Sequence, residues 1–500
     1  MKFTTTLIII LVIIGQISAQ PVLSPLEKNN YQKVTSYEEL TDFVKQLDEK
    51  SDLLKIETIG QSVQGRNLYA MKFSSSEFGK DKSKIKILFF AQQHGNEQSG
   101  KEGALLLAQN LLKPENKYLF DKIDFVLIPQ VNPDGSEANK RRNGNDMDLN
   151  RNHLILTEPE TQALHVFFDK YLFEVSMDVH EYSPYGGEWG KYGYRKNADV
   201  TLGATTNPNV SENIRTLSNN EVLPYVLKSL SVNNFSSFVY CPGGPPEQDY
   251  IRHSTFDVND GRQSLGIQNT LSFIQEGMNG TDMLLENIKH RSEGQMQGMR
   301  AMLEYVYLHK NEIKKLVASS RKGLISGKSN PQVSIQSEHV SNGQKLTFPL
   351  FSYSTDKDTV VIVKDYRPVV KTITDVQKPA GYLIPKQNKE LVEWVGKHAF
   401  VTADFKPKKG QKIEQYTITG IDSIDFERDI IVDPNVETTE FSDEITPSGY
   451  LYIPTNQLKG NSIVLALEPK SMLGLVTYKQ YEHLLKIGEP FPVLRLMTKP

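Results

Sequence analysis

The sequence has a single cysteine, Cys241, among its 500 residues. One thiol cannot form a disulfide within the chain, so the fold must depend on its hydrophobic core, and we expect Cys241 to be a small buried residue. Beyond the first nineteen residues, no stretch approaches the roughly 18 continuous apolar residues that cross a bilayer. The formal net charge is only -3, with both signs interspersed, which gives no reason to expect nucleic acid or a membrane surface as a partner.

What is present is a folded, globular composition with a distinct N-terminus. With 38% hydrophobic and 23% charged residues, a chain of this length is expected to form two domains. Lys2, the apolar run Leu7–Ile14 and the small pair Ser18-Ala19 are typical of a signal peptide over residues 1–19. We therefore predict an exported chain, secreted or periplasmic, without a membrane span once it is mature; an uncleaved anchor is the alternative.

Four apolar runs predict strands buried on both faces. Each run leads to a polar or charged residue whose side chain could take part in binding or catalysis. The runs are Ile85–Ala91, Ile123–Pro129, Phe173–Asp178 and Leu271–Gln275. The residues that follow them are His94, Asn132, His180 and Glu276. In α/β sheets ligands bind outside the carboxyl ends of the strands, so these four side chains are expected to converge.

The pattern changes after about residue 323. Short strands separated by turns indicate an antiparallel β region; they are Gln332–Gln336, Thr359–Val363, Ala399–Ala403, Gln415–Ile421 and Ile463–Glu468. We predict a catalytic domain over residues 20–322 and a β-rich accessory domain over residues 323–500. Within the first, residues 183–222 are rich in Gly, Pro, Asn and Tyr and are interpreted as an extended loop with a helix in its second half.

His94 and Glu97, three residues apart after a buried strand, form the first candidate metal motif. An imidazole and a carboxylate in this position can bind one small cation, and Zn²⁺ accepts both kinds of ligand. This short motif also arises by chance in many proteins. Its weight comes from the motifs that follow it.

Four motifs in order resemble the zinc carboxypeptidases of the M14 family. They are His94-x-x-Glu97, Asn150-Arg151 within DLNRN, His180 within DVHEY, and Glu276 at the end of LSFIQE. The resemblance covers roughly residues 50 to 310. It implies an α/β fold with a mixed central sheet flanked by helices, followed here by the smaller β-rich region.

By this resemblance, His94, Glu97 and His180 would bind one zinc ion, and Glu276 would be the general base and acid. Such a ligand set leaves a position open for water, and a carboxylate at the end of an apolar strand is costly to bury unless it is used or paired. His153 and His165 compete as ligands. We expect His165 to be structural and His153 to lie behind the metal ligands.

The resemblance also implies a substrate site. Asn150 and Arg151 would hold the terminal carboxylate, because a guanidinium presents a planar fork to it. Either Arg141 or Arg142 would stabilise the oxyanion, with Arg141 at the usual spacing. Tyr250 is the candidate for a substrate-capping tyrosine, and Tyr182, Tyr185 and Tyr240 compete with it.

The sequence therefore predicts an exported zinc metallocarboxypeptidase that acts on peptides with a free C-terminus. The sequence does not determine its side-chain preference, because Asp257 and Asp260 would either attract basic side chains or pair with Arg252 and Arg262, nor its oligomeric state. The alternatives are a zinc amidoacylase of the aspartoacylase type, whose third ligand is usually followed by Asn-Thr, and a binding or adhesion protein that keeps the metal without catalysis. Glu276 argues against the latter, because a protein without catalysis has no need of a proton shuttle.

Overall fold

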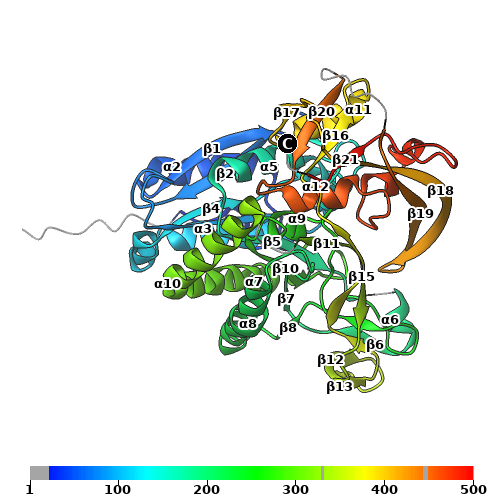
Figure 1. The fold of residues 1–500 in the computed structure, drawn as a ribbon. Helices are drawn as coiled ribbons and strands as arrows, with labels where there is room; N and C mark the ends of the chain where they lie inside the picture. Colours follow the sequence, from blue (N-terminus) through cyan, green and yellow to red (C-terminus); the bar gives the residue numbers. More distant parts are fainter. Residues whose placement is uncertain (1–21, 186, 328–330, 443–448, 499–500) are drawn as a thin grey trace, which may run out of the picture.

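The computed structural model describes residues 22–185, 187–327, 331–442 and 449–498 (Figure 1). The predicted signal peptide, residues 1–19, lies outside the described residues. Within the described ranges, no helix combines the length and the apolar character needed to cross a membrane.

A mixed eight-stranded sheet forms the centre of the molecule, in the order β1-β2-β4-β3-β5-β10-β7-β8. Its strands are β1 (Leu54–Gln61), β2 (Asn67–Phe73), β3 (Ile85–Ala91), β4 (Ile123–Ile128), β5 (Val175–Tyr182), β7 (Val200–Ala204), β8 (Ser237–Val239) and β10 (Leu271–Met278). The four strands predicted from the apolar runs are β3, β4, β5 and β10, and they pair as parallel neighbours. Their carboxyl ends therefore lie at one edge of the sheet, as the sequence predicts.

Helices cover both faces of this sheet, because alternate residues of the buried strands are apolar on both sides. Ile87 and Phe89 share a hydrophobic cluster with the helices α2 (Tyr37–Lys50), α3 (Gln98–Leu111), α8 (Leu223–Val232) and α10 (Ile288–Ser326). Leu88 and Phe90 pack with α5 (Pro159–Tyr171) and α9 (Gly261–Gly266) on the other face. The shorter helices are α1 (Pro25–Lys28), η1 (Pro114–Asp121), α4 (Pro133–Glu137), η2 (Leu149–Arg151), α6 (Gly187–Lys191), α7 (Glu212–Leu217) and η3 (Ser218–Val222).

Residues 332–498 form the predicted antiparallel β region, together with several helices. Its strands are β11 (Gln332–Val340), β12 (Leu346–Ser352), β13 (Lys357–Val363), β14 (Tyr366–Arg367), β15 (Val369–Gln377), β16 (Gly381–Pro385), β17 (Ala403–Asp404), β18 (Ile413–Phe426), β19 (Asp429–Glu440), β20 (Tyr450–Pro454) and β21 (Leu494–Leu496). Its helices are α11 (Lys389–Lys397), α12 (Gly460–Leu467), η4 (Leu475–Thr477) and η5 (Glu482–Leu484). Figure 1 shows this C-terminal region, yellow to red, on the opposite side of the sheet from α3, α8 and α10. The fold class predicted from the sequence is confirmed.

Three local predictions were wrong. Ile463–Glu468 lies in α12 and its cap, because an apolar run of this length fits a buried helix as well as a strand. Ala399–Ala403 is irregular except for its last residue, which begins β17. The predicted loop 183–222 contains the sheet strand β7 and the short strand β6 (Tyr194–Lys196).

The two parts of the chain are joined by strand pairing. β6 pairs with β12, and β9 (Ile251–Arg252) pairs with β14. The indole N–H of Trp394 in α11 donates a hydrogen bond of 2.8 Å to the carbonyl oxygen of Leu154. The division into two domains at residue 322 stays a prediction.

Candidate metal centre and substrate site

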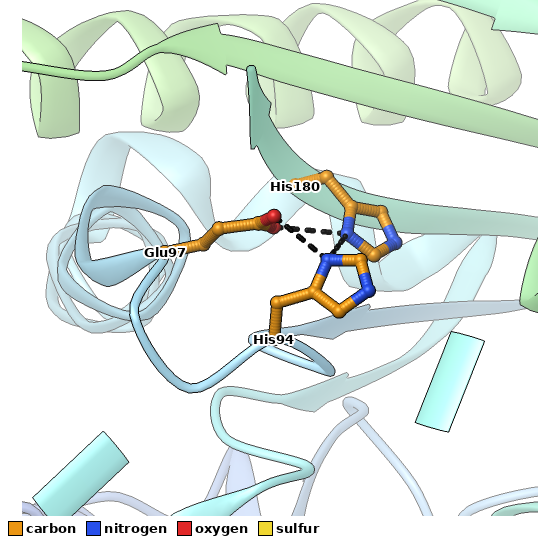
Figure 2. Close-up of side chains that lie close together, drawn as sticks. All are labelled: His94, Glu97 and His180. Atoms are coloured by element: carbon orange, nitrogen blue, oxygen red, sulfur yellow. Dashed lines mark hydrogen bonds and ion pairs between the residues drawn. The ribbon is translucent and has the colours of Figure 1, made fainter. Parts of the chain in front are cut away.

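Three side chains from β5 and from the turn between β3 and α3 converge on one point at the carboxyl edge of the sheet (Figure 2). They are His94, Glu97 and His180, and all three are buried. Nδ1 of His94 lies 2.7 Å from Oε1 of Glu97, and Nδ1 of His180 lies 3.0 Å from Oε2 of the same carboxylate. The two Nδ1 atoms are 3.2 Å apart. Their potential ligand atoms all lie within 4.8 Å of one another.

Two further carboxylates orient the imidazoles from behind. Nε2 of His94 lies 3.1 Å from Oδ1 of Asp148, and Nε2 of His180 lies 2.8 Å from Oδ1 of Asp178. A carboxylate behind an imidazole fixes its tautomer and directs the other ring nitrogen towards a metal. We did not predict these two carboxylates from the sequence. Asp178 precedes His180 by two residues on β5, so strand alternation places both on one face, which was a usable signal.

The charges of the cluster favour a cation. Against the effect of burial, the carboxylates of Asp178 and Glu97 raise the pKa of His180 well above its ordinary value. Against the same effect, the imidazoles of His94 and His180 lower the pKa of Glu97. The carboxylates therefore stabilise positive charge at this point. Two imidazole nitrogens and one carboxylate are also ligands that Zn²⁺ accepts.

Glu276 lies on β10 directly opposite His180 of β5 in the parallel register. Its side chain faces the cluster with 8% of the residue exposed. Burial raises the pKa of the Glu276 carboxyl to about 7, although the imidazoles of His180 and His94 act in the opposite direction. A carboxyl group with this pKa can both accept and donate a proton near neutral pH.

The structure separates the two candidate arginines. Nη1 of Arg141 lies 3.6 Å from Oε1 of Glu97, and its Nη2 lies 3.0 Å from Oδ2 of Asp148. Nη1 of Arg142 instead lies 3.6 Å from Oδ2 of the exposed Asp146. Arg141 is therefore the guanidinium at the cluster, and its side chain stays 47% exposed.

Asn150 and Arg151 follow each other in η2 beside this cluster. The amide oxygen of Asn150 accepts hydrogen bonds from the backbone N–H of Gly261 (2.8 Å) and from Nε2 of Gln93 (3.3 Å). Arg151 is exposed, and its Nη1 donates to the carbonyl oxygen of Asn150 at 2.8 Å. Burial of part of its side chain acts to lower the pKa of Arg151. The carboxylates around it, Asp257 first among them, outweigh this effect and raise the pKa.

The candidate tyrosines occupy different places. The ring of Tyr250 lies 4.1 Å from the guanidinium carbon of Arg367 in the C-terminal region. Burial raises the pKa of Tyr240, and the charge of Glu276 adds to this while Arg151 opposes it. The ring of Tyr240 lies 5.9 Å from the guanidinium carbon of Arg262. Tyr182 donates its hydroxyl to the carbonyl oxygen of Ala198.

The remaining histidines lie behind the cluster. Nε2 of His153 lies 2.7 Å from Oε1 of Gln93, whose Nε2 donates to Oδ2 of Asp178 at 2.8 Å. Nδ1 of His153 lies 3.0 Å from Nε2 of His165. His153 is therefore connected to His180 through the side chains of Gln93 and Asp178. His165 is a buried residue of α5.

Comparisons with known proteins find carboxypeptidases that are similar to this chain. Residues 40–226 match the family model described as zinc carboxypeptidase. The chain is 23% identical over 480 residues to carboxypeptidase 2 of Trichophyton rubrum, covering 92% of this chain and 86% of the relative. It is 27% identical over 247 residues to human carboxypeptidase D, covering 42% of this chain and only 18% of that longer protein.

Solved structures of similar proteins include a metallo-carboxypeptidase from Burkholderia cenocepacia. It shares 17% identity with a TM-score of 0.42, covering 55% of this chain and 69% of the other. Residues 40–226 of this chain are therefore similar to zinc carboxypeptidases, and the named relatives of similar length are carboxypeptidases, which are peptide hydrolases.

Proposed function

We propose that this chain removes residues from the free C-terminus of peptides, with one zinc ion held by His94, Glu97 and His180. The observation that carries the proposal is the meeting of these three side chains with Glu276 at the carboxyl ends of β5 and β10. Zinc at such a site supplies a Lewis acid that polarises a carbonyl group and makes water more acidic. Asp148 and Asp178 keep the two imidazoles oriented for this ion.

Glu276 is the group to which we assign proton transfer. Its carboxylate takes a proton from the attacking water and passes it to the nitrogen of the leaving amine. Burial beside the cluster, which raises its pKa to about 7, supports both steps. Arg141, beside Glu97 and Asp148, donates to the oxygen on which negative charge develops.

Arg151 and Asn150 are proposed to hold the terminal carboxylate of the peptide. The guanidinium of Arg151 is exposed and can present two parallel N–H groups to a carboxylate. The oxygen of Asn150 is already engaged by two donors, so its NH₂ group is the part that faces a ligand. Tyr250 stays the candidate for the substrate-capping tyrosine, with Tyr182, Tyr185 and Tyr240 as its competitors.

Metal analysis combined with a peptide-library digest tests the proposal. We expect about one zinc ion per chain, trimming from the C-terminus only, loss of trimming on chelation and recovery with added zinc. Hydrolysis of N-acyl amino acids alone would instead support an amidoacylase. A chain that retains zinc but cuts neither class would support a binding protein without catalysis.

Export is a separate part of the proposal and rests on residues 1–19. We expect the mature chain to begin at Gln20 and to leave the cytoplasm. N-terminal sequencing of the protein recovered from the medium or periplasm tests this. Recovery from the cell interior with Met1 intact would contradict it.

A further inference from the structure

The loop over residues 249–260, which leads into α9, contacts both residues assigned to the terminal carboxylate. Nδ2 of Asn259 donates to the carbonyl oxygen of Arg151 at 2.6 Å. The backbone N–H of Gly261, which begins α9 directly after the loop, donates to Oδ1 of Asn150 at 2.8 Å. Asn259 is completely buried. The position of the loop therefore determines where the backbone of Arg151 and the side chain of Asn150 lie.

The segment after Arg151 is held between this loop and the C-terminal region. Oδ1 of Asn259 accepts a hydrogen bond of 2.6 Å from the backbone N–H of Leu154. The carbonyl oxygen of Leu154 accepts from Nε1 of Trp394 at 2.8 Å and from Nε2 of His398 at 2.7 Å. Both polar groups of this peptide backbone are thus fixed, one by the loop and one by residues that follow it by more than 130 positions.

The tip of the β18–β19 hairpin also contacts the loop. Figure 1 shows the hairpin curving away from the six-stranded sheet towards β15. The ring of Phe426, the last residue of β18, packs edge-on against Phe256 of the loop, with the ring centres 5.4 Å apart. The ring of His339 in β11 lies 5.4 Å from Phe256 as well. Phe256 is buried, and two strands of the C-terminal region take part in covering it.

The turn of the hairpin consists of Glu427 and Arg428, whose φ angles of 52° and 83° lie in the left-handed region. Two-residue hairpin turns of this kind prefer Gly, Asn or Asp, because other side chains are strained there. Oε1 of Glu427 lies 3.6 Å from Nε of Arg252. Nη1 of Arg428 lies 3.3 Å from Oδ2 of Asp249. A strained turn whose two side chains both form ion pairs with one loop has its strain offset by that contact.

We propose that the β18–β19 hairpin positions Arg151 and Asn150 for the terminal carboxylate of the peptide, acting through the loop. Phe426 is then a positioning residue, which holds the loop and does not contact the peptide. A bidentate contact between a guanidinium and a carboxylate depends on a fixed direction of approach, so a looser loop weakens it. The inference rests on the proposed function and deepens it. The hairpin lies outside residues 40–226, which match the family model.

Phe426→Ala, which removes the ring from the contact with the loop, tests the proposal. The substrates are the peptide that is cut fastest in the library digest and its C-terminal amide. We expect KM for the acid to rise roughly tenfold with kcat within about twofold, because the carboxylate is bound less well while the metal centre is unchanged. The preference for the acid over the amide should fall by a similar factor. In Arg151→Ala, the same hairpin substitution should change KM no further.

Ile430→Ala is the matched control, since Ile430 follows the turn in β19 and is 70% exposed. It should leave KM, kcat and the melting temperature unchanged, and Phe426→Tyr, which keeps an aromatic ring, should retain the parent KM. Glu427→Gln, which removes the charge facing Arg252, should raise KM roughly threefold and replaces the alanine variant if that variant does not fold. An unchanged KM in the folded hairpin variant would overturn the proposal, as would an equal rise in the control.

Hydrogen exchange separates this inference from the proposed function, because it needs no substrate. Phe426→Ala should speed exchange roughly tenfold at the backbone N–H groups of Leu154 and Gly261, whose acceptors are the two asparagine side chains, and Ile430→Ala should leave both unchanged. A wild-type chain that cuts no peptide refutes the proposed function. Unchanged exchange at both groups refutes the role of the hairpin, whether or not the chain is active.

Discussion

Two buried glutamates, one in each part of the molecule, show how the catalytic sheet and the C-terminal region differ. Glu468, at the end of α12, accepts hydrogen bonds from the hydroxyls of Tyr382 (2.5 Å) and Tyr416 (2.8 Å) and from Nε of Arg495 (2.9 Å). Glu276 on β10 instead faces imidazoles and other carboxylates, and burial raises its pKa to about 7. The first carboxylate is fully engaged in holding the fold, whereas the second has a pKa at which we expect a carboxyl group to exchange a proton near neutral pH.

The contrast shows that burial of an acid does not by itself indicate catalysis. A buried carboxylate with three donors has a stabilising role, because the hydrogen bonds and the neighbouring guanidinium compensate its charge. A buried carboxylate beside a cation site with a raised pKa has the properties of a proton shuttle. The partners therefore distinguish the two roles where the residue type does not.

The largest expected effect separates the glutamates directly. Glu276→Gln removes the proton acceptor while keeping size and shape, so kcat should fall roughly a thousandfold or more. Zinc content and melting temperature should stay close to those of the parent. Steady-state kinetics with metal analysis checks this, and a variant that retains a tenth of the activity would remove Glu276 from the mechanism.

The reciprocal substitution should affect stability instead of rate. Among the described residues, Glu468→Gln leaves Arg495 with Glu414 as its one ion-pair partner, at 2.7 Å, and we expect a loss of roughly 3 kcal/mol in the free energy of unfolding. Urea denaturation measures this loss, and kcat of the folded variant should be unchanged. Loss of activity without loss of stability would mean that the comparison between the two regions is mistaken.

A smaller effect on rate is expected at the adjacent arginines. Arg141→Ala removes the guanidinium beside Glu97 and should lower kcat roughly a hundredfold. Arg142→Ala, the matched control, removes an exposed ion pair with Asp146 and should change kcat less than about twofold. Kinetics of the pair checks the assignment, which equal losses in the two variants would contradict.

The smallest expected effect is a pH dependence of stability at the contact between the two parts. There the ring of His398, in the C-terminal region, lies 6.2 Å from the ring of His165. Burial lowers the pKa of His398 to about 3 and that of His153 to about 4. The unfolded chain therefore binds more protons below pH 6.5, and unfolding becomes easier as the pH falls towards the folded pKa values. For each of these two histidines, the free energy of unfolding should fall by roughly 1 kcal/mol when the pH is lowered from 7 to 5.5.

Denaturation at the two pH values, in the parent and in His398→Gln, measures this dependence. The variant lacks one of the buried titratable rings, so its free energy of unfolding should fall less on acidification. An identical pH dependence in both proteins would show that His398 does not contribute to it.

The sequence predicted the catalytic half well because its signals are local. The apolar runs of β3, β5 and β10 are long enough to identify buried strands, and parallel pairing then requires His94, His180 and Glu276 to meet. β7 was missed because the five residues Val200–Ala204, which include Gly203, give little strand signal within a polar loop. The choice between Arg141 and Arg142 depends on side-chain direction in an irregular loop, which spacing does not determine.

The contacts between the C-terminal region and residues 249–260 could not be found from the sequence. Phe426 of the β18–β19 hairpin packs against Phe256, and Oε1 of Glu427 lies 3.6 Å from Nε of Arg252. Such contacts between distant segments leave no periodic signal. For the same reason the sequence indicated only an accessory role for the region.

The pairings of β6 with β12 and of β9 with β14 have a consequence for how the chain is made. Leu350 aligns with Lys196, and Tyr366 aligns with Ile251, so these short sheets join partners far apart in the order of synthesis. A nascent chain emerging from the ribosome exposes the edges of β6 and β9 until the later strands arrive. Refolding should accordingly be slow and sensitive to protein concentration, and a chaperone that shields the early half should improve the yield.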